Sequence, residues 1–206
     1  MRKRHRGRRH KGTKKSADNR VLRDEFSHWP RATSHGSLIQ GVLELNDKVK
    51  KLEELKKIRA ELKRANKKVI FTNGCFDIIH VGHVRLLREA KKQGDALVLA
   101  INSDASVRAL KGGKRPYVPE AERAEVMAGL ESVDYVIIFN ELDPLQVITE
   151  LEPDVLVKGG DWSVDTIIGR DVVEGAGGKV ISLPFVDGLS TTNIIQRILE
   201  GNARAK

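Results

Sequence analysis

The sequence predicts a doubly wound α/β domain built on a parallel sheet of five strands. After Lys68, short apolar runs alternate with stretches in which apolar residues recur at helical spacing. A run such as Ala96–Asn102 (ALVLAIN) is apolar throughout, which is typical of strands covered by helices on both faces. Because ligands bind such sheets at the carboxyl ends of the strands, the residues that follow each strand are the candidates for a functional site.

Each expected element is set by its apolar period and by the residues that flank it. Pro119 supports the start of a helix, because proline is common in the first helical turn. The expected folded domain covers residues 67–206. We expect strands at 69–72, 96–102, 135–139, 155–157 and 180–183, and helices at 82–93, 119–130, 144–151 and 191–199.

A further amphipathic helical segment is expected at residues 37–66. Its apolar stripe either forms a dimerisation seam or lies across its own domain, so a homodimer is one possible assembly. Fewer than four clean heptads are too few for a coiled coil. The apolar residues that define the stripe are Leu38, Val42, Leu45, Val49, Leu52, Leu55, Ile58 and Leu62.

The positive charge of the chain is confined to its amino end. The chain of 206 residues has 37 Lys and Arg against 28 Asp and Glu, and its first 20 residues hold ten basic residues and one acidic residue. Residues 1–36 are therefore expected to be a disordered basic leader, which either meets phosphate-rich partners by charge alone or is simply solvated. The rest is neutral overall. A nucleic-acid-binding protein would carry basic residues on its folded part, so nucleic acid is not an expected partner.

Cysteine content and hydropathy exclude two further classes of protein. A single cysteine cannot form an internal disulfide, so a secreted, disulfide-stapled fold is not expected. No apolar stretch approaches the roughly 18 residues of a membrane-spanning helix, and no membrane partner is expected.

The strongest motif directly follows the first expected strand. Gly74 permits a tight turn that brings backbone N–H groups close to a bound anion. His80 and His83 are three residues apart at the mouth of a helix, where both rings can act on the same phosphoryl oxygen. Zinc is a poorer alternative, because no third ligand has suitable spacing. Cys75 is interpreted as a small buried residue. The whole motif reads Asn73-Gly74-Cys75-Phe76-Asp77-Ile78-Ile79-His80-Val81-Gly82-His83.

The segment His80-Val81-Gly82-His83 is similar to the HxGH signature of the cytidylyltransferase-like nucleotidyltransferases. The rest of the domain resembles one branch of them, the D-glycero-β-D-manno-heptose 1-phosphate adenylyltransferases, over about residues 67–200. The motifs that carry this second resemblance are Asn102–Val107, Leu110–Gly112 with Arg115-Pro116, Val133–Val136, Leu156–Asp161 and Asp187–Ile195.

The resemblance implies a role for each of these motifs. Without it, Lys111 and Arg115 would be interpreted as a solvated basic loop, and Ser190–Thr192 as an ordinary helix cap. With it, His80, His83 and Lys111 are expected to be catalytic, and the nucleotide is expected to contact Gly74, Cys75, Phe76, His80, His83, Arg115, Lys158, Ser190, Thr191 and Thr192. The sugar phosphate is expected to contact Asp104, Lys158, Gly159 and Asp161, where Asp104 and Asp161 bind either sugar hydroxyls or a metal.

The chain departs from other branches of this superfamily at Phe185–Gly188. The glycerol-phosphate and choline-phosphate members carry an arginine there, and this chain has none. The difference argues against those two branches. It also implies that another cation takes over the contact with phosphate.

The resemblance implies direct transfer of a nucleotidyl group from ATP to a sugar 1-phosphate. The sugar phosphate is already ionised near neutral pH, so the reaction requires neither a general base nor a covalent intermediate. Mg²⁺ is expected to be held chiefly by ATP. The bifunctional relatives have a sugar kinase domain before this one, for which the first 66 residues are too short, so we expect a stand-alone transferase in a bacterial cytoplasm.

Two alternatives stay open from the sequence. The nearer one is a cytidylyltransferase that uses CTP and glycerol 3-phosphate or a similar phosphorylated alcohol. The more distant one is a nucleic-acid-binding protein that uses the basic leader and has the α/β domain as a scaffold.

Overall fold

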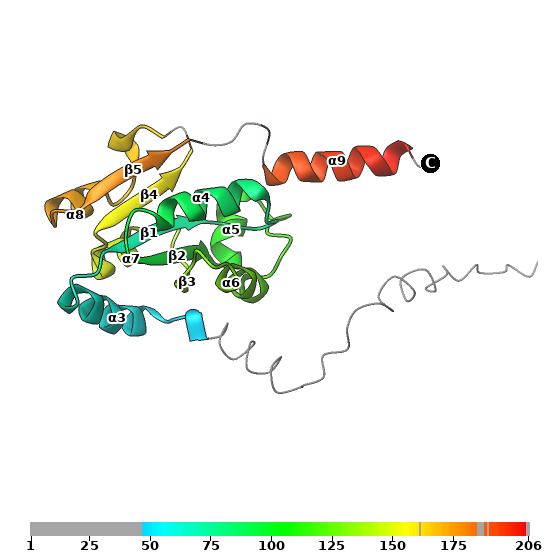
Figure 1. The fold of residues 1–206 in the computed structure, drawn as a ribbon. Coiled ribbons are helices and arrows are strands. Elements are labelled where there is room, and N and C mark those ends of the chain that lie inside the picture. Colours follow the sequence, from blue (N-terminus) through cyan, green and yellow to red (C-terminus); the bar gives the residue numbers. More distant parts are fainter. Residues whose placement is uncertain (1–46, 161, 185–187, 189, 205–206) are drawn as a thin grey trace, which may run out of the picture. The chain divides into compact units, whose positions relative to one another are not determined.

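Five parallel strands form one sheet in the order β3-β2-β1-β4-β5 (Figure 1). The structure is a computed structural model, and it describes residues 47–160, 162–184, 188 and 190–204. The predicted leader at 1–36 lies outside the described residues. The strands are β1 (Val69–Gly74), β2 (Ala96–Asn102), β3 (Tyr135–Phe139), β4 (Val155–Gly159) and β5 (Lys179–Leu183). The predicted five-stranded parallel sheet is therefore confirmed.

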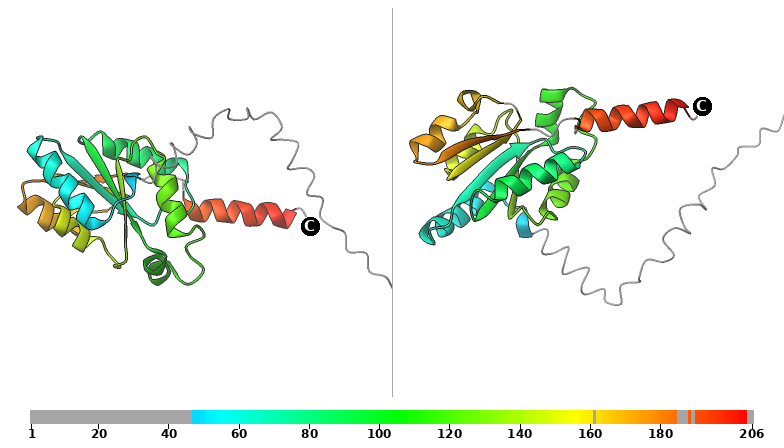
Figure 2. Two further views of the ribbon diagram at one scale, coloured as in Figure 1. Left: turned by 90° about the horizontal axis from the view of Figure 1, so that it is seen from below. Right: turned by 45° about the horizontal axis from the view of Figure 1, so that its top comes forward.

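Helices connect the strands and cover both faces of the sheet. They are α3 (Leu52–Arg64), α4 (Val81–Lys91), α5 (Asp104–Lys111), α6 (Glu120–Ala128), α7 (Leu145–Leu151), α8 (Arg170–Gly175) and α9 (Thr191–Arg204), with a 3-10 turn η1 (Val164–Thr166). Helices α4 and α6 pack on one face, and α3, α7 and α8 pack on the other (Figures 1 and 2).

The pleat of the strands divides the core between the two faces. In β1, Ile70 points to the α4 and α6 side, whereas Val69 and Phe71 point to the α3 and α7 side. All three side chains are fully buried, as expected for a strand with apolar neighbours above and below it.

Strand β1 pairs with β2 on one side and with β4 on the other. The chain thus leaves β1 toward one half of the sheet and later returns to the other half. In parallel sheets this reversal opens a crevice at the carboxyl ends of the two strands where the direction switches. The crevice between the ends of β1 and β4 is therefore the expected place for a ligand.

The helices α5 and α8 and the turn η1 were not expected from the sequence. Helix α5 begins at once after β2, where the Ser103 hydroxyl accepts a hydrogen bond from the Ser106 N–H at 3.2 Å. Helix α8 has six residues and α5 has eight, and each buries only one apolar residue, so neither shows a clear apolar period. Pro119 caps α6 instead of lying in its first turn.

The amphipathic segment at 37–66 is divided in the structure. Val49 pairs with Val136 at the edge of β3, and α3 starts three residues later. Leu55 is fully buried on the α7 side of the sheet, and three further apolar residues of the predicted stripe pack there with it: Leu52, Ile58 and Leu62. This half of the stripe lies across its own domain. Leu38, Val42 and Leu45 lie outside the described residues, and homodimerisation stays a prediction.

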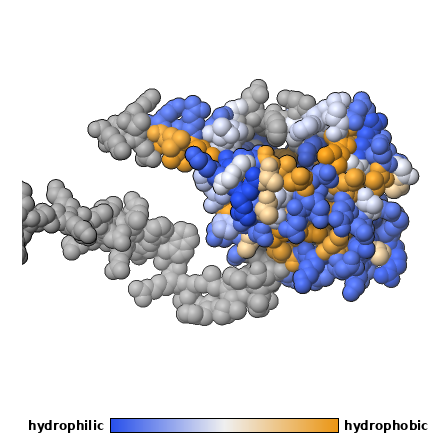
Figure 3. Space-filling view, turned by 180° about the vertical axis from the view of Figure 1, so that it is seen from behind, coloured by the Kyte–Doolittle hydropathy of each residue, from blue (hydrophilic) through white to orange (hydrophobic). Residues whose placement is uncertain are grey.

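Helix α9 exposes most of its length to solvent. Ile198 and Leu199 have exposed fractions of 56% and 64%, and Figure 3 shows apolar side chains on this helix. The N-terminal turn of α9 is the part that contacts the sheet domain, through the Thr191 hydroxyl, which donates to the Ile78 carbonyl at 3.2 Å.

Candidate active site

The predicted histidine pair lies at the carboxyl end of β1, at the start of α4. His80 has an extended backbone and caps the helix, and His83 lies in its first turn. The two rings stack with their centroids 3.9 Å apart. On each ring the Nδ1 atom is buried and has no hydrogen-bond partner among the described residues. Buried polar atoms are normally paired, so two unpaired ring nitrogens side by side mark this pair as a candidate functional site.

Burial favours the neutral form of both histidines. Burial lowers the pKa of His80 below its ordinary value of 6.5. Burial, together with the nearby His80 and Lys111, lowers the pKa of His83 to about 4. The charge of Lys111 therefore acts on His83, which agrees with the predicted grouping of these three residues.

The turn before the histidines is formed by Phe76. Its backbone is left-handed, with φ of 46°, and its ring lies 5.0 Å from the ring of His83. Gly74 has no left-handed backbone, contrary to the tight turn expected there. Its lack of a side chain serves a different purpose, because a Cβ at Gly74 would lie 2.9 Å from the Phe76 ring. The glycine thus makes room for the ring that supports His83.

Lys111 is the last residue of α5, where a glycine-bounded loop was expected. Gly112 ends the helix with a left-handed φ of 90°. The Lys111 side chain is exposed, and its position at the helix end places it close enough to affect the pKa of His83. A cation at this site is free to contact phosphate.

Arg115 is already engaged, which differs from the mobile cation that the sequence suggested. Its Nε lies 2.7 Å from Oδ2 of Asp77, and the Asp77 side chain is 1% exposed. The guanidinium also lies over the ring of Tyr117, 5.0 Å from its centroid. Asp77 further accepts backbone hydrogen bonds from Tyr117 at 2.7 Å and from Val118 at 2.9 Å. Arg115 and Asp77 thus tie the segment 112–118 to the turn that precedes the histidines.

Lys158 lies on β4, and its side chain reaches across to the end of β1. Its Nζ donates to Oδ1 of Asn73 at 3.1 Å, and burial lowers its pKa. Cys75 is half-buried and its thiol lies 3.9 Å from Oδ1 of Asn102, so it is less enclosed than expected. Gly159 allows α4 to pack closely, since a Cβ there would lie 2.6 Å from the Leu86 side chain.

Asp104 does not point freely into the crevice. Its Oδ1 accepts a hydrogen bond from Nη2 of Arg123 at 2.8 Å, and its backbone N–H donates to Glu120. The other predicted carboxylate, Asp161, lies outside the described residues. So do residues 185–187, which belong to the stretch where the chain departs from other branches of the superfamily. Where a metal was a possible role for these carboxylates, the described residues contain no group of three His, Cys, Asp or Glu side chains suited to a metal ion.

The Ser-Thr-Thr motif lies at the start of α9, as predicted. The Ser190 hydroxyl accepts a hydrogen bond from the Asn193 N–H at 3.1 Å, and the Thr191 hydroxyl contacts the loop that carries the histidines. Thr192 is exposed. The N-terminus of α9 is therefore joined to the loop that leads into α4, and two neighbouring helix N-termini suit a ligand with several phosphates.

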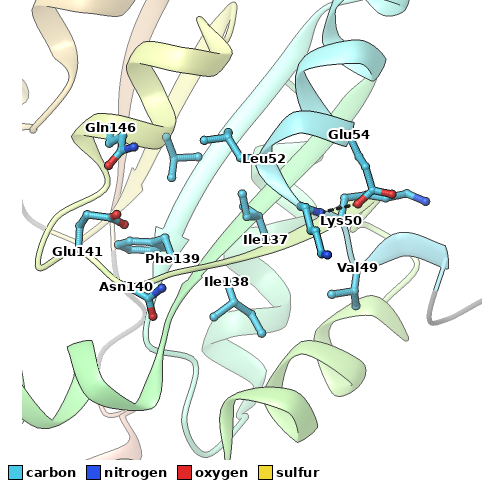
Figure 4. A pocket seen from close by; sticks show the side chains of 12 residues that line it. Val49, Lys50, Leu52, Glu54, Ile137, Ile138, Phe139, Asn140, Glu141 and Gln146 are labelled. Carbon is cyan, nitrogen blue, oxygen red and sulfur yellow. Dashed lines mark hydrogen bonds between the residues drawn. The ribbon is translucent and has the colours of Figure 1, made fainter.

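One hollow in the described part of the chain lies apart from the histidine pair. A depression of about 440 Å³ opens beside the edge strand β3, between α3 and α7 (Figure 4). It is lined by residues such as Val49, Ile137 and Gln146, and none of the predicted site residues contributes to it.

No helix in the described part of the chain is both long and apolar enough to cross a membrane.

A doubly wound parallel sheet with an HxGH pair at the switch point is the arrangement that the resemblance to the cytidylyltransferase-like family implied. Residues 71–197 match the cytidylyltransferase-like family. The chain belongs to that family.

Similar proteins extend this assignment. "Bifunctional protein HldE" of Syntrophotalea carbinolica is 49% identical to this chain, over 81% of this chain and 34% of its own length. The protein of the same name from Geobacter metallireducens is 57% identical, over 74% of this chain and 31% of its own length. The chain thus spans about a third of these relatives. The lipopolysaccharide core biosynthesis protein of Thermoplasma volcanium aligns with a TM-score of 0.51 and 30% identity, over 59% of this chain and 99% of that one.

Proposed function

We propose that this protein transfers AMP from ATP to D-glycero-β-D-manno-heptose 1-phosphate, giving ADP-heptose and pyrophosphate. The observation that carries the proposal is the pair of stacked histidines at the switch point of the sheet, with Lys111 close enough to lower the pKa of His83. The sugar specificity is supported by the sequence motifs of the heptose branch and by relatives of about 50% identity.

The reaction is a direct displacement at phosphorus. An oxygen of the sugar 1-phosphate attacks the α-phosphorus of ATP, and the bond from that phosphorus to the oxygen that bridges the α- and β-phosphates breaks. The electron pair of the broken bond leaves with pyrophosphate. No proton has to be removed from the attacking oxygen near neutral pH, so the protein contributes position and charge stabilisation.

The roles of the side chains follow from their places around the crevice. His80 and His83 donate to the bridging oxygen and to the oxygens of the α-phosphate, where negative charge grows in the transition state. Lys111 assists from the end of α5. Ser190, Thr191 and Thr192 hold the departing pyrophosphate at the N-terminus of α9.

The sugar phosphate binds on the β4 side of the crevice. Lys158 and Gly159 contact it, and Lys158 gains a partner for its half-buried charge when the phosphate arrives. Asp161 follows in the sequence and binds a sugar hydroxyl. Arg115 and Asp104 support the site indirectly, because each is paired within the protein: Arg115 with Asp77 and Asp104 with Arg123.

ATP enters the reaction as its Mg²⁺ complex, and the ion is part of that substrate. The phosphates supply its main ligands. The cation neutralises phosphate charge, and the residues of the protein act on the remaining oxygens.

Pyrophosphate release from purified protein tests the proposal. ATP and CTP are each offered with the heptose 1-phosphate and with glycerol 3-phosphate. We expect turnover with ATP and the heptose phosphate alone. Turnover with CTP and glycerol 3-phosphate would instead support the cytidylyltransferase alternative with the same fold. The product is a precursor for cell-envelope polysaccharide such as the lipopolysaccharide core, and the setting that we propose is a bacterial cytoplasm.

A further inference from the structure

The side chain of Arg123 is the largest that is fully buried in the described part of the protein. It lies in the first turn of α6, and its exposed fraction is zero. Arginine is almost never fully buried unless its charge is paired, and its burial alone stabilises a fold poorly. An arginine in this position therefore calls for an explanation other than core packing.

The guanidinium of Arg123 joins four segments of the chain. Its Nε donates to the Val118 carbonyl at 2.9 Å, and Nη1 donates to the Cys75 carbonyl. Its Nη2 donates to the Asn102 carbonyl and to the Asp104 carboxylate, each at 2.8 Å. These acceptors lie just after β1, at the end of β2, at the start of α5 and before α6.

Two of these segments carry the predicted catalytic groups. The Cys75 carbonyl belongs to the turn that leads to His80 and His83. The Asp104 carboxylate lies at the start of α5, the helix that ends at Lys111. Arg123 thus contacts both the histidine-bearing turn and the lysine-bearing helix, although it touches neither the histidines nor the lysine.

The buried Asp77 reinforces the same link from the other side. It belongs to the histidine-bearing turn and binds the Arg115 guanidinium and the N–H groups of Tyr117 and Val118. Val118 is therefore held by its N–H from Asp77 and by its carbonyl from Arg123. Both backbone polar groups of Val118 are therefore bonded, which fixes the end of the segment 112–118 next to α6.

We propose that Arg123 is a positioning residue that sets the distance between the histidine pair and Lys111. The inference rests on the proposed nucleotidyl transfer, in which these groups act on one phosphoryl group. The planar guanidinium has five N–H donors in a fixed fork, and four of these donors form the four hydrogen bonds described above. No other side chain can hold these four acceptors at one spacing.

The test compares Arg123→Lys with Arg59→Lys. Arg59 is a matched control, because it also donates to two backbone carbonyls and one carboxylate, those of Leu151, Glu152 and Asp154. Asp154 directly precedes β4, so this cluster lies at the amino end of the sheet, away from the crevice. The Arg59 side chain is 11% exposed and that of Arg123 is fully buried, so the thermal unfolding midpoint of each variant is measured to compare the structural cost of the two substitutions.

Steady-state kinetics and ATP affinity are then measured well below both unfolding midpoints. We expect Arg123→Lys to lower kcat at least about 10-fold, because small displacements of catalytic groups are costly, and to weaken ATP binding about 3- to 10-fold. Arg59→Lys is expected to stay within about 2-fold of the unchanged chain. A further variant, Arg123→Met, should have a lower kcat than Arg123→Lys, since lysine still reaches some of the acceptors.

The outcomes separate this inference from the proposed function. If Arg123→Lys matches Arg59→Lys in kcat and in ATP affinity, Arg123 is only structural and the inference is wrong. If the unchanged chain releases no pyrophosphate with any substrate pair, the proposed function fails. In that case, the ATP affinities of Arg123→Lys and Arg59→Lys are compared without the kinetics, and they decide whether Arg123 has the positioning role. Should Arg123→Met not fold, the comparison of the two lysine variants still gives the answer.

Discussion

At the residue scale, the histidine pair shows how burial prepares a site for anions. His83 is enclosed by Phe76 and stacked on His80, so its charged form is disfavoured, and an unpartnered ring nitrogen remains. Charge that grows on a phosphoryl oxygen in the transition state meets donors that are already in place.

The rate of the proposed reaction should depend strongly on His83. We expect His83→Ala to lower kcat/KM by about 100-fold or more, as the loss of one oxyanion donor does in other enzymes. The measurement is pyrophosphate release at saturating ATP and varied heptose 1-phosphate, with circular dichroism to establish that the variant is folded. A folded variant with an unchanged rate would remove His83 from the mechanism.

The stability of the protein should fall in mild acid because of the same residue. The pKa of His83 is about 4 in the folded chain and 6.5 ordinarily, so between these values the unfolded chain binds more protons. Its contribution to the free energy of unfolding is complete above pH 6.5 and is lost as the pH falls toward 4. Urea unfolding at pH 7 and pH 5 should show a smaller loss for His83→Gln than for the unchanged chain. An equal loss in both would show that His83 is not held neutral.

At the element scale, α3 completes one face of the sheet. The Leu55 side chain is 1% exposed and packs in the cluster that includes Phe71 of β1 and Ile148 of α7. The sequence left a dimerisation seam and an intramolecular position equally open for this helix. The buried face of α3 supports the intramolecular position for residues 52–64.

Truncation of Leu55 should therefore destabilise the single chain. We expect Leu55→Ala to lower the free energy of unfolding by about 2–5 kcal/mol, the usual cost of a large-to-small change in a core. Lys57→Ala is the control, because Lys57 is exposed on the same helix. Urea denaturation at several protein concentrations measures both. If the effect of Leu55→Ala disappears on dilution, the helix serves an interface between copies instead.

At the scale of the whole molecule, the strands and the place of the HxGH pair at the end of β1 could be predicted from the sequence. Continuous apolar runs indicate buried parallel strands, and the switch point places their ends together. The short helices α5 and α8 could not be predicted, because each buries a single apolar residue and so shows no apolar period, whereas the equally short α7 buries three.

The supporting residues of the site could not be predicted for a different reason. Arg123 stands among charged residues at the start of α6, where an arginine is normally exposed. One available signal is that it shares a helical face with Met127, which is buried. Arg115 was assigned to phosphate because no sequence pattern shows that Asp77 is buried beside it. Pairings of this kind depend on contacts between segments far apart in the chain.

The central claim is the transfer of AMP from ATP to a heptose 1-phosphate. Its most direct test is a competition in which equal concentrations of ATP and CTP are given to the protein with D-glycero-β-D-manno-heptose 1-phosphate, and the sugar nucleotides formed are identified by mass spectrometry. The doubly substituted His80→Ala, His83→Ala protein serves as the blank. We predict ADP-heptose as the dominant product, formed only by the unchanged chain. CDP-heptose as the main product, or equal amounts of product from the blank, would contradict the account.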